Sequence, residues 1–392
     1  MKVIVAHSDR QYCNHLLLTL AQQGWLERFY TLFSGNKYAS FAPLFPSLVW
    51  RHLSKRAVDP SLTPYIRHFP FLFGIDRMIG QLNPNYYRPA YEWFDRAVAG
   101  RLRRHAFDLV VTYENANRHT VRTAKKLGKT TVLDLAQIHH DDIARYGKDF
   151  MSVREWRLEV EYINPRKAEA LDYTDYVITL SSFAAESMQK NGWPSERLFT
   201  VPLGVDGARF VAKERYPSRR PLQLLFVGTL TLRKGLAVLL EAMRLLPART
   251  AELTLIGPMA DASELLRRHA GRFRYSPFLS HDALARHYRQ ADLFVFPSWL
   301  DSWAQTVLEA MACGTPAVVS DRTGAREAVE QGGGWVVPAG DARALADVIA
   351  MCADEPDLLP LFGIRAANIA RTYSWEHYQR QMAEVFRQIG PA

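Results

Sequence analysis

The chain has few cysteines and no long hydrophobic segment. Its three cysteines, Cys13, Cys313 and Cys352, are far apart and form no Cys-x-x-Cys pair. This spacing argues against a disulfide framework or a structural zinc site and is typical of a reducing compartment. Because no run of about 18 uninterrupted apolar residues occurs, we expect no membrane-spanning helix. The N-terminal sequence lacks the apolar region and cleavage site of a signal peptide, so we expect a cytoplasmic protein.

Two ligand-binding motifs are also missing. The loop after the first predicted strand reads SDRQYCNH, at residues 8–15, and contains no glycine. The absence of a G-x-G-x-x-G fingerprint weakens the case for a dinucleotide-dependent dehydrogenase. No obvious Asp-x-Asp motif is present that would hold a metal ion.

The composition is that of a large, folded and basic protein. A length of 392 residues exceeds what one hydrophobic core usually supports, so we expect two domains. A hydrophobic content of 48% with 23% charged residues belongs to a folded chain. The 49 Lys and Arg against 40 Asp and Glu give a net charge of +9. This excess suits a nucleotide, a nucleic acid or an acidic membrane surface, although a generally basic surface would give the same value.

Short apolar runs alternate with helix-like segments in both halves of the chain, which is the pattern of doubly wound parallel α/β sheets. Residues 202–221, rich in proline, glycine and charge, interrupt the alternation and mark a domain boundary. We therefore predict two Rossmann-like domains, residues 1–203 and 204–372, and an amphipathic helix in 373–392 that packs on the first domain. The clearest strands are predicted at residues 2–7, 107–114, 130–136, 175–181, 222–230, 251–257, 292–298, 317–321 and 334–338.

Residues 34–106 are the least regular part of the sequence, and they mix Phe, Trp and Tyr with Arg and Lys. Amphipathic segments of this kind can lie in a membrane interface. A helical insertion whose aromatic side chains pack inward would have the same composition, so both interpretations remain open.

The stretch DSWAQTVLEAMACGTPAVVSD, residues 301–321, contains two acids eight positions apart, Asp301 and Glu309. It follows a predicted strand and begins a predicted helix. Ligands of doubly wound sheets bind at this place, where the helix N-terminus favours a phosphate. Two helical residues at this spacing would lie about 12 Å apart along the axis, too far for a paired-carboxylate glycosidase. We therefore predict that the two acids bind different parts of one long ligand, a sugar and a ribose on either side of phosphates.

A second stretch in the same domain, VGTLTLRKGLAVLLEA at residues 227–242, supplies cations. Gly228 follows the first strand of the domain, and Arg233 and Lys234 directly precede a predicted helix. Two cations at a strand–helix junction can bind a diphosphate and stabilise it as it leaves. We predict that they face the acidic loop at the same edge of the sheet.

These stretches resemble the retaining GT-B glycosyltransferases of family 4. The resemblance is specific over about residues 200–380, and it rests on VPLGVDGARF, FVGTLTLRKGLAVLLEA, PSWLDSWAQTVLEAMACGTPAVVSD, GAREAVEQGGGWVVPAGDARALADVI and YSWEHY. It implies the GT-B fold, in which two Rossmann-like domains face a central cleft and a C-terminal helix crosses back to the first domain. The chain departs from the family at Asp301, where the family has Glu, at 302–304, where it has glycines, and at Thr229, where it often has Arg.

The resemblance also implies roles for residues of the second domain. Arg233 and Lys234 would hold the donor diphosphate, Asp301 would contact sugar hydroxyls, and these three would be catalytic. Glu309 would bind the ribose, and the 276–279 segment would contact the nucleobase. The implied donor-binding residues are Gly228, Arg233, Lys234, Phe278, Asp301, Ser302, Trp303, Gln305, Thr306 and Glu309.

On the acceptor side, the informative run is LDLAQIHHDD, residues 133–142, at the end of a predicted strand. Members of the family often have a His near this point, so the resemblance adds His139 or His140 to the catalytic set, with Asp134 and Gln137 as rivals. The residues alone also allow a metal site, which would need ligands from elsewhere. A third interpretation is a polar loop that caps the next helix.

The resemblance implies transfer of a hexose from a nucleoside-diphosphate sugar, with retention and without a metal or other cofactor. The acceptor would be a glycan or a lipid-linked acceptor in cell-surface polysaccharide biosynthesis. Together with the basic charge, this suggests peripheral contact with the inner face of an anionic membrane and no nucleic acid partner. Two alternatives remain: a GT-B nucleotide-sugar epimerase or hydrolase, and a non-catalytic protein that binds nucleotides or nucleic acids.

Overall fold

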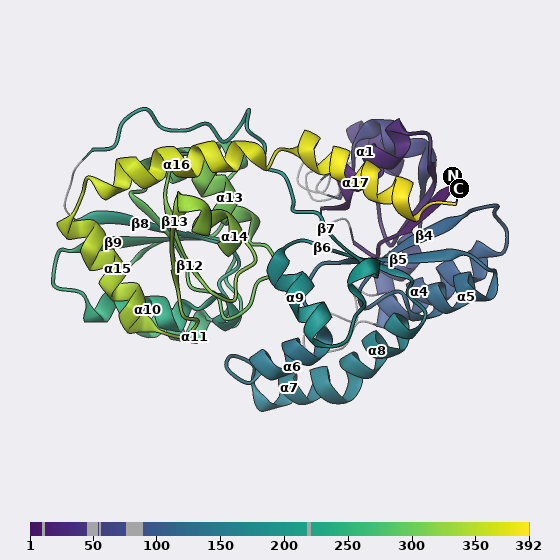
Figure 1. The fold of residues 1–392 in the computed structure, drawn as a ribbon, viewed down its shortest axis with the longest axis horizontal. Coiled ribbons are helices and arrows are strands. Elements are labelled where there is room, and N and C mark those ends of the chain that lie inside the picture. Colours follow the sequence, from purple (N-terminus) through teal and green to yellow (C-terminus); the bar gives the residue numbers. More distant parts are fainter. Residues whose placement is uncertain (10–11, 45–53, 55, 76–88, 218–220, 392) are drawn as a thin grey trace.

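The apolar runs form the strands of two parallel sheets, each flanked by helices, in a computed structural model of the chain (Figure 1). The structure describes residues 1–392 except 10–11, 45–53, 55, 76–88, 218–220 and 392. Every pairing between neighbouring strands is parallel in this described part. Strands such as Leu109–Tyr113 are fully buried, which explains why they read as continuous apolar runs rather than as alternating ones.

The first sheet has seven strands in the order β3-β2-β1-β4-β5-β6-β7, so the direction of winding reverses between β1 and β4. Ligands of doubly wound sheets bind beside such a reversal, at the carboxyl ends of the strands. The strands are β1 (Val3–Ala6), β2 (Leu26–Thr31), β3 (Ile66–His68), β4 (Leu109–Tyr113), β5 (Thr130–Leu135), β6 (Tyr176–Thr179) and β7 (Leu198–Thr200). Its helices are α1 (Cys13–Gln22), α4 (Pro89–Leu102), α5 (Arg118–Lys126), α6 (His140–Gly147), α7 (Val153–Leu158), α8 (Asn164–Asp172) and α9 (Ser182–Lys190), with short 3₁₀ or π turns η1 (Gly35–Leu44), η2 (Pro60–Tyr65), η3 (Glu159–Ile163) and η4 (Ser195–Arg197).

The second sheet has six strands in the order β10-β9-β8-β11-β12-β13 and reverses between β8 and β11. Its strands are β8 (Leu222–Val227), β9 (Ala251–Ile256), β10 (Arg274–Ser276), β11 (Leu293–Phe296), β12 (Ala317–Ser320) and β13 (Gly334–Val337). The helices are α10 (Leu236–Leu245), α11 (Ser263–Arg268), α12 (His281–Gln290), α13 (Gln305–Ala312), α14 (Arg326–Ala328), α15 (Ala342–Asp354) and α16 (Leu358–Thr372), with the turns η5 (Leu232–Lys234) and η6 (Val329–Gly333). The chain then ends in α17 (Trp375–Ile389).

The chain crosses between the two domains twice, and both crossings lie together. The backbone N–H of Val205 donates to the carbonyl of Tyr373 at 2.8 Å. A side chain at Gly204 would have its Cβ 2.4 Å from the backbone nitrogen of Trp375, so the two segments can approach this closely only at a glycine. Beyond the crossing, α17 lies along α1 of the first domain (Figure 1), and the Trp375 ring stacks on His15 with centroids 3.6 Å apart.

The predicted insertion at residues 34–106 lies partly outside the described residues. In the described part, Phe69 and Phe94 are buried and their rings meet edge to face, whereas Phe71 is 77% exposed. Among the described residues, no helix combines the length and the apolar character needed to cross a bilayer.

Candidate active site

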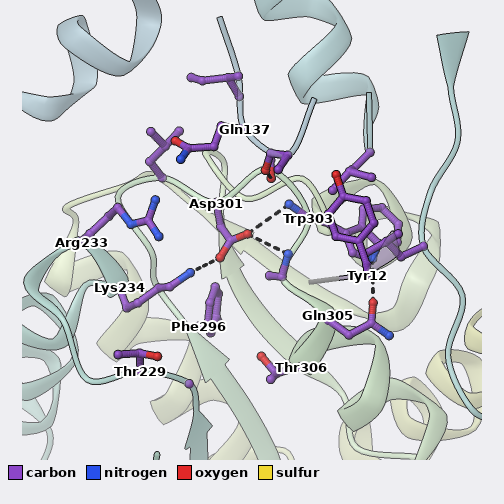
Figure 2. Close-up of a pocket in the computed structure, with 18 of the residues that line it drawn as sticks. Tyr12, Gln137, Thr229, Arg233, Lys234, Phe296, Asp301, Trp303, Gln305 and Thr306 are labelled. Carbon is purple, nitrogen blue, oxygen red and sulfur yellow. Dashed lines mark hydrogen bonds and ion pairs between the residues drawn. The ribbon is translucent and has the colours of Figure 1, made fainter. Parts of the chain in front are cut away.

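The loops at the carboxyl ends of both sheets line an open cavity of about 380 Å³ between the domains (Figure 2). This volume lies in the range of small-molecule binding sites. The first domain contributes Tyr12, Ala136, Gln137, Ile138, Leu180 and Leu203, and the second contributes Val227, Gly228, Thr229, Arg233, Lys234, Phe296, Leu300, Asp301, Ser302, Trp303, Ala304, Gln305 and Thr306.

Arg233 and Lys234 reach the cavity from η5, a single turn between β8 and α10. The carbonyl of Arg233 accepts hydrogen bonds from the backbone N–H of Trp299 at 2.8 Å and from the hydroxyl of Ser298 at 3.1 Å. Gly235 then turns the chain with a φ of 74°, and a Cβ there would lie 1.8 Å from the Pro297 carbonyl oxygen. The turn is therefore fixed against the loop that follows β11.

Lys234 forms an ion pair with Asp301 inside the cavity (Figure 2), and its ammonium lies 5.2 Å from the centre of the Phe296 ring. Burial by itself raises the pKa of the Asp301 carboxyl, but the charges of Lys234 and Arg233 outweigh burial and hold that pKa below its usual value. Asp301 is thus ionised, and each charge compensates the other. The predicted meeting of the cationic turn and the acidic loop is present in the structure.

The loop that holds Asp301 folds back on its own carboxylate. Oδ1 of Asp301 accepts hydrogen bonds from the backbone N–H groups of Trp303, at 3.1 Å, and Ala304, at 2.8 Å. Asp301 therefore occupies the backbone amides of Trp303 and Ala304. Ala304 has a φ of 66°, a left-handed conformation that glycine adopts without strain but alanine does not.

The same loop is tied to the first domain. The Ser302 hydroxyl donates to the carbonyl of Ala136, and the Ser302 carbonyl accepts from the Ser181 hydroxyl at 2.7 Å. Within the second domain, the Gln305 side chain donates to the carbonyl of Gly204, at the crossing between the domains, at 2.7 Å and accepts from the Trp303 indole at 3.2 Å. The predicted donor loop is therefore also a contact between the domains.

Two predicted donor residues do not line this cavity. Glu309 faces α12, where its Oε2 accepts a hydrogen bond from the Tyr288 hydroxyl at 2.8 Å, and burial raises the pKa of Glu309 to about 7. Phe278 is 65% exposed and lies outside the lining. The ribose and nucleobase contacts assigned to these residues stay predictions.

The two histidines lie elsewhere. His139 and His140 line a separate cavity of about 10 Å³, which has room for a single water and not for a sugar. The ring of His139 accepts from the backbone N–H of Asp141 at 3.3 Å and so caps α6. Of the rivals, Gln137 lines the large cavity and Asp134 lies buried behind it. Of the three interpretations of this run, the geometry favours the polar capping loop.

The histidines and Asp141 also raise the question of a metal. Their ligand atoms lie within 4.8 Å of one another. Burial lowers the pKa of both rings, that of His140 to about 4, so both rings are neutral and each has one unprotonated nitrogen. However, the site lies at the N-terminus of α6, which disfavours a cation.

Sequence reasoning did not assign Tyr12 and Phe296, although both line the cavity. Phe296 is the last residue of β11 and lies next to the ammonium of Lys234. In the sequence it cannot be told apart from the apolar residues of the buried strand. Tyr12 lies in the loop SDRQYCNH, whose lack of glycine was the available signal that side chains could line the cavity there.

The segment that contains the cationic turn and the acidic loop is similar to a known protein family. Residues 221–355 match the family model for glycosyl transferases group 1. The chain is 29% identical over 213 residues to the amylovoran biosynthesis glycosyltransferase AmsK of Erwinia amylovora, a match that covers 50% of this chain and 52% of that protein. It is 27% identical over 246 residues to the O-antigen chain mannosyltransferase B of Escherichia coli, which covers 58% of this chain and 64% of the relative. The matches thus span about half to two thirds of these curated relatives.

Solved structures match over the whole chain. Sucrose-phosphate synthase from Thermosynechococcus elongatus superposes with a TM-score of 0.70 at 21% identity and covers 99% of both chains. Anabaena HepE in complex with UDP-glucose has a TM-score of 0.65 at 17% identity, covering 99% of this chain and all of that one. The predicted GT-B fold is confirmed.

Proposed function

We propose that the protein is a retaining glycosyltransferase of family 4 that transfers a hexose from a nucleoside-diphosphate sugar to a glycan or a lipid-linked acceptor. The observation that carries this proposal is the cavity in which Lys234, Arg233 and Asp301 meet, at the carboxyl ends of the strands and within the segment that matches glycosyl transferases group 1. The names of the relatives, which refer to amylovoran and O-antigen glycosyltransferases, support a role in cell-surface polysaccharide biosynthesis.

The ion pair suggests how the donor binds. A diphosphate that approaches Lys234 and Arg233 brings its own negative charge, so Lys234 no longer requires Asp301 as its partner. Oδ2 of Asp301, which pairs with Lys234, is then available to accept hydrogen bonds from sugar hydroxyls. The donor diphosphate thus replaces Asp301 as the anionic partner of Lys234, and sugar hydroxyls replace Lys234 as the hydrogen-bond donors to Asp301.

In the proposed reaction, the bond between the anomeric carbon and the diphosphate oxygen breaks, and the acceptor oxygen bonds to the same face of that carbon. The acceptor proton passes to the departing diphosphate. Lys234, Arg233 and the N-terminus of α13 stabilise the charge that develops on the leaving group. We expect turnover to persist with EDTA present, and the product linkage should keep the anomeric configuration of the donor.

A peripheral membrane contact is a separate part of the proposal. It is motivated by the net charge of +9 and by the exposed Phe71 in the aromatic and basic region. Flotation with liposomes that contain anionic lipid should carry the protein, whereas neutral liposomes should carry less. Absence of binding to both would remove this part.

The donor site is tested by calorimetric titration with UDP, GDP, ADP and their sugars. We expect one nucleotide to bind, and Lys234→Met to weaken its affinity by at least tenfold. Because this variant leaves Asp301 unpaired, the matched control is Lys234→Met with Asp301→Asn, which restores charge balance but not the diphosphate contact. Unchanged affinity in a folded double variant would contradict the proposal. Rapid epimerisation or hydrolysis of donor alone would instead favour the epimerase or hydrolase alternative.

A further inference from the structure

A buried carboxylate lies behind the wall that the first domain contributes to the cavity. Asp134 is on β5, is 1% exposed, and lies two residues before Ala136, where the lining begins. Burial raises the pKa of Asp134 to about 6, and the neighbouring phenols of Tyr113 and Tyr12 act in the opposite direction. Its Oδ2 atom has no hydrogen-bond partner among the residues that the structure describes.

Three tyrosines from separate elements surround this carboxylate. Tyr113 ends β4, Tyr378 lies on α17, and Tyr12 immediately precedes α1. Tyr113 and Tyr378 are buried, but Tyr12 also lines the cavity. In the view of Figure 2, Tyr12 lies on the other side of Asp301 from Lys234. Tyr12 is therefore the member of this cluster that can meet a ligand.

The hydrogen bond of Tyr12 has a defined direction. Its hydroxyl donates to Oδ1 of Asp134 at 3.1 Å, and its ring packs edge-on against Tyr113 with centroids 5.9 Å apart. Burial and the nearby carboxylate raise the pKa of Tyr12 well above its usual value, so the phenol keeps its proton. A phenol has a single O–H donor, and in Tyr12 this donor is already hydrogen-bonded to Asp134. The oxygen of Tyr12 can then offer only lone pairs to a ligand.

We propose that Tyr12 binds a non-reacting hydroxyl of the acceptor sugar and that Asp134 positions Tyr12 by accepting the hydrogen bond of its phenol. Because the Tyr12 oxygen can only accept, its partner must be a hydrogen-bond donor, and a sugar hydroxyl can act as one. It also places the first-domain contact of the acceptor at Tyr12 rather than at the histidines. This inference rests on the proposed function, because it presupposes that a sugar acceptor enters the cavity.

The test compares transfer with hydrolysis, because water needs no contact with Tyr12. Using the nucleotide sugar that binds in calorimetry, we would measure transfer to p-nitrophenyl glycosides of glucose, galactose, mannose and rhamnose, and hydrolysis without them. Tyr12→Phe should lower the ratio of transfer to hydrolysis about tenfold, through a higher acceptor KM, and leave nucleotide affinity unchanged. Tyr173→Phe, whose ring lies under Arg122 outside the cavity, is the matched control and should behave as wild type.

Asp134 is tested by a double-mutant cycle. Asp134→Asn should lower the same ratio, but it should add less than a further twofold when Tyr12→Phe is already present, since it acts through Tyr12. Equal loss of hydrolysis and transfer in Tyr12→Phe, or a ratio like that of wild type, would overturn the inference. So would a full Asp134→Asn effect in the Tyr12→Phe background. A wild-type chain that binds no nucleotide and turns over no donor would instead overturn the proposed function.

Discussion

The two domains present different chemistry to the cavity that they share. The second domain contributes an ion pair, Lys234 with Asp301, and a second cation, Arg233. The first domain contributes mostly apolar and backbone groups, with Gln137 and the phenol of Tyr12 as its polar side chains. The charged half suits the phosphates of a donor, whereas the neutral half suits hydroxyl groups. The difference suggests that donor binding depends on charge, and acceptor binding on hydrogen-bond direction.

The largest expected effect is on the charged half. Lys234→Met should lower the free energy of unfolding by about 3–5 kcal/mol, because it leaves Asp301 buried without its partner. Urea unfolding measures this, with Lys234→Met and Asp301→Asn combined as the control that should regain most of the loss. A single variant as stable as wild type would show that Asp301 is compensated by other groups.

Each domain also contains a buried acid with a raised pKa, Asp134 in the first and Glu309 in the second. Their effects on stability should occur at different pH values. The pKa is about 6 for Asp134 and about 7 for Glu309, both above the values of an unfolded chain. The native state therefore keeps these protons up to a higher pH than the unfolded chain does. The free energy of unfolding falls as the pH rises through each folded pKa. Shifts of this size correspond to about 3 kcal/mol each.

The measurement is urea unfolding of Asp134→Asn and Glu309→Gln from pH 4 to pH 8. Relative to wild type, each variant should gain stability as the pH rises, and the gain should level off near pH 6 for Asp134→Asn and near pH 7 for Glu309→Gln. A difference from wild type that does not change with pH would contradict the assignment for that residue.

A smaller effect is expected where the domains meet. One carboxylate oxygen of Glu327 in the second domain accepts from the backbone N–H of Ser182, at 2.8 Å, and from its hydroxyl, at 2.7 Å, at the start of α9 in the first. Glu327→Ala should cost about 2 kcal/mol, since hydrogen bonds to charged groups contribute 1.5–3 kcal/mol. Glu186→Ala is the control, because the Glu186 side chain is 61% exposed and its interdomain pair with Arg326 should contribute less than about 1 kcal/mol. An equal loss of unfolding free energy in the two variants would mean that the buried contact is no stronger than the exposed one.

The smallest effect concerns backbone strain in the loop that holds Asp301. Ala304→Gly should raise the free energy of unfolding by about 1 kcal/mol, because glycine adopts the φ of 66° without a steric penalty. Thermal unfolding would register this as a higher Tm. Ala310→Gly, within α13, is the matched control and should be destabilising. A lower Tm for Ala304→Gly would indicate that the Ala304 side chain contributes packing that outweighs the strain.

The charged half of the site could be predicted from sequence because its residues lie close together along the chain. Arg233 and Lys234 are adjacent, and the acidic loop follows its strand directly, so local spacing and the rule for strand ends were sufficient. The strands that are apolar throughout were predicted for the same reason. β2 was not, because Glu27 and Arg28 interrupt its apolar run.

The neutral half could not be predicted because tertiary contacts determine it. His139 and His140 follow a cavity-lining segment in sequence, but His139 caps α6 and both rings turn to a different cavity. Tyr12 meets Asp134 across 122 positions of sequence, a contact that no local pattern contains. Glu309 accepts a hydrogen bond from Tyr288 on the neighbouring helix. This contact depends on the packing of α12 against α13, which the sequence does not show.

The most direct test of the charge-based donor site is a crystal structure with the nucleoside diphosphate that binds in calorimetry. We predict that its phosphate oxygens lie within about 3.2 Å of the side-chain nitrogens of Lys234 and Arg233, beside the start of α13. A nucleotide bound instead in the separate cavity lined by Arg274, Tyr275 and His287, with the pair of Lys234 and Asp301 intact, would contradict the account.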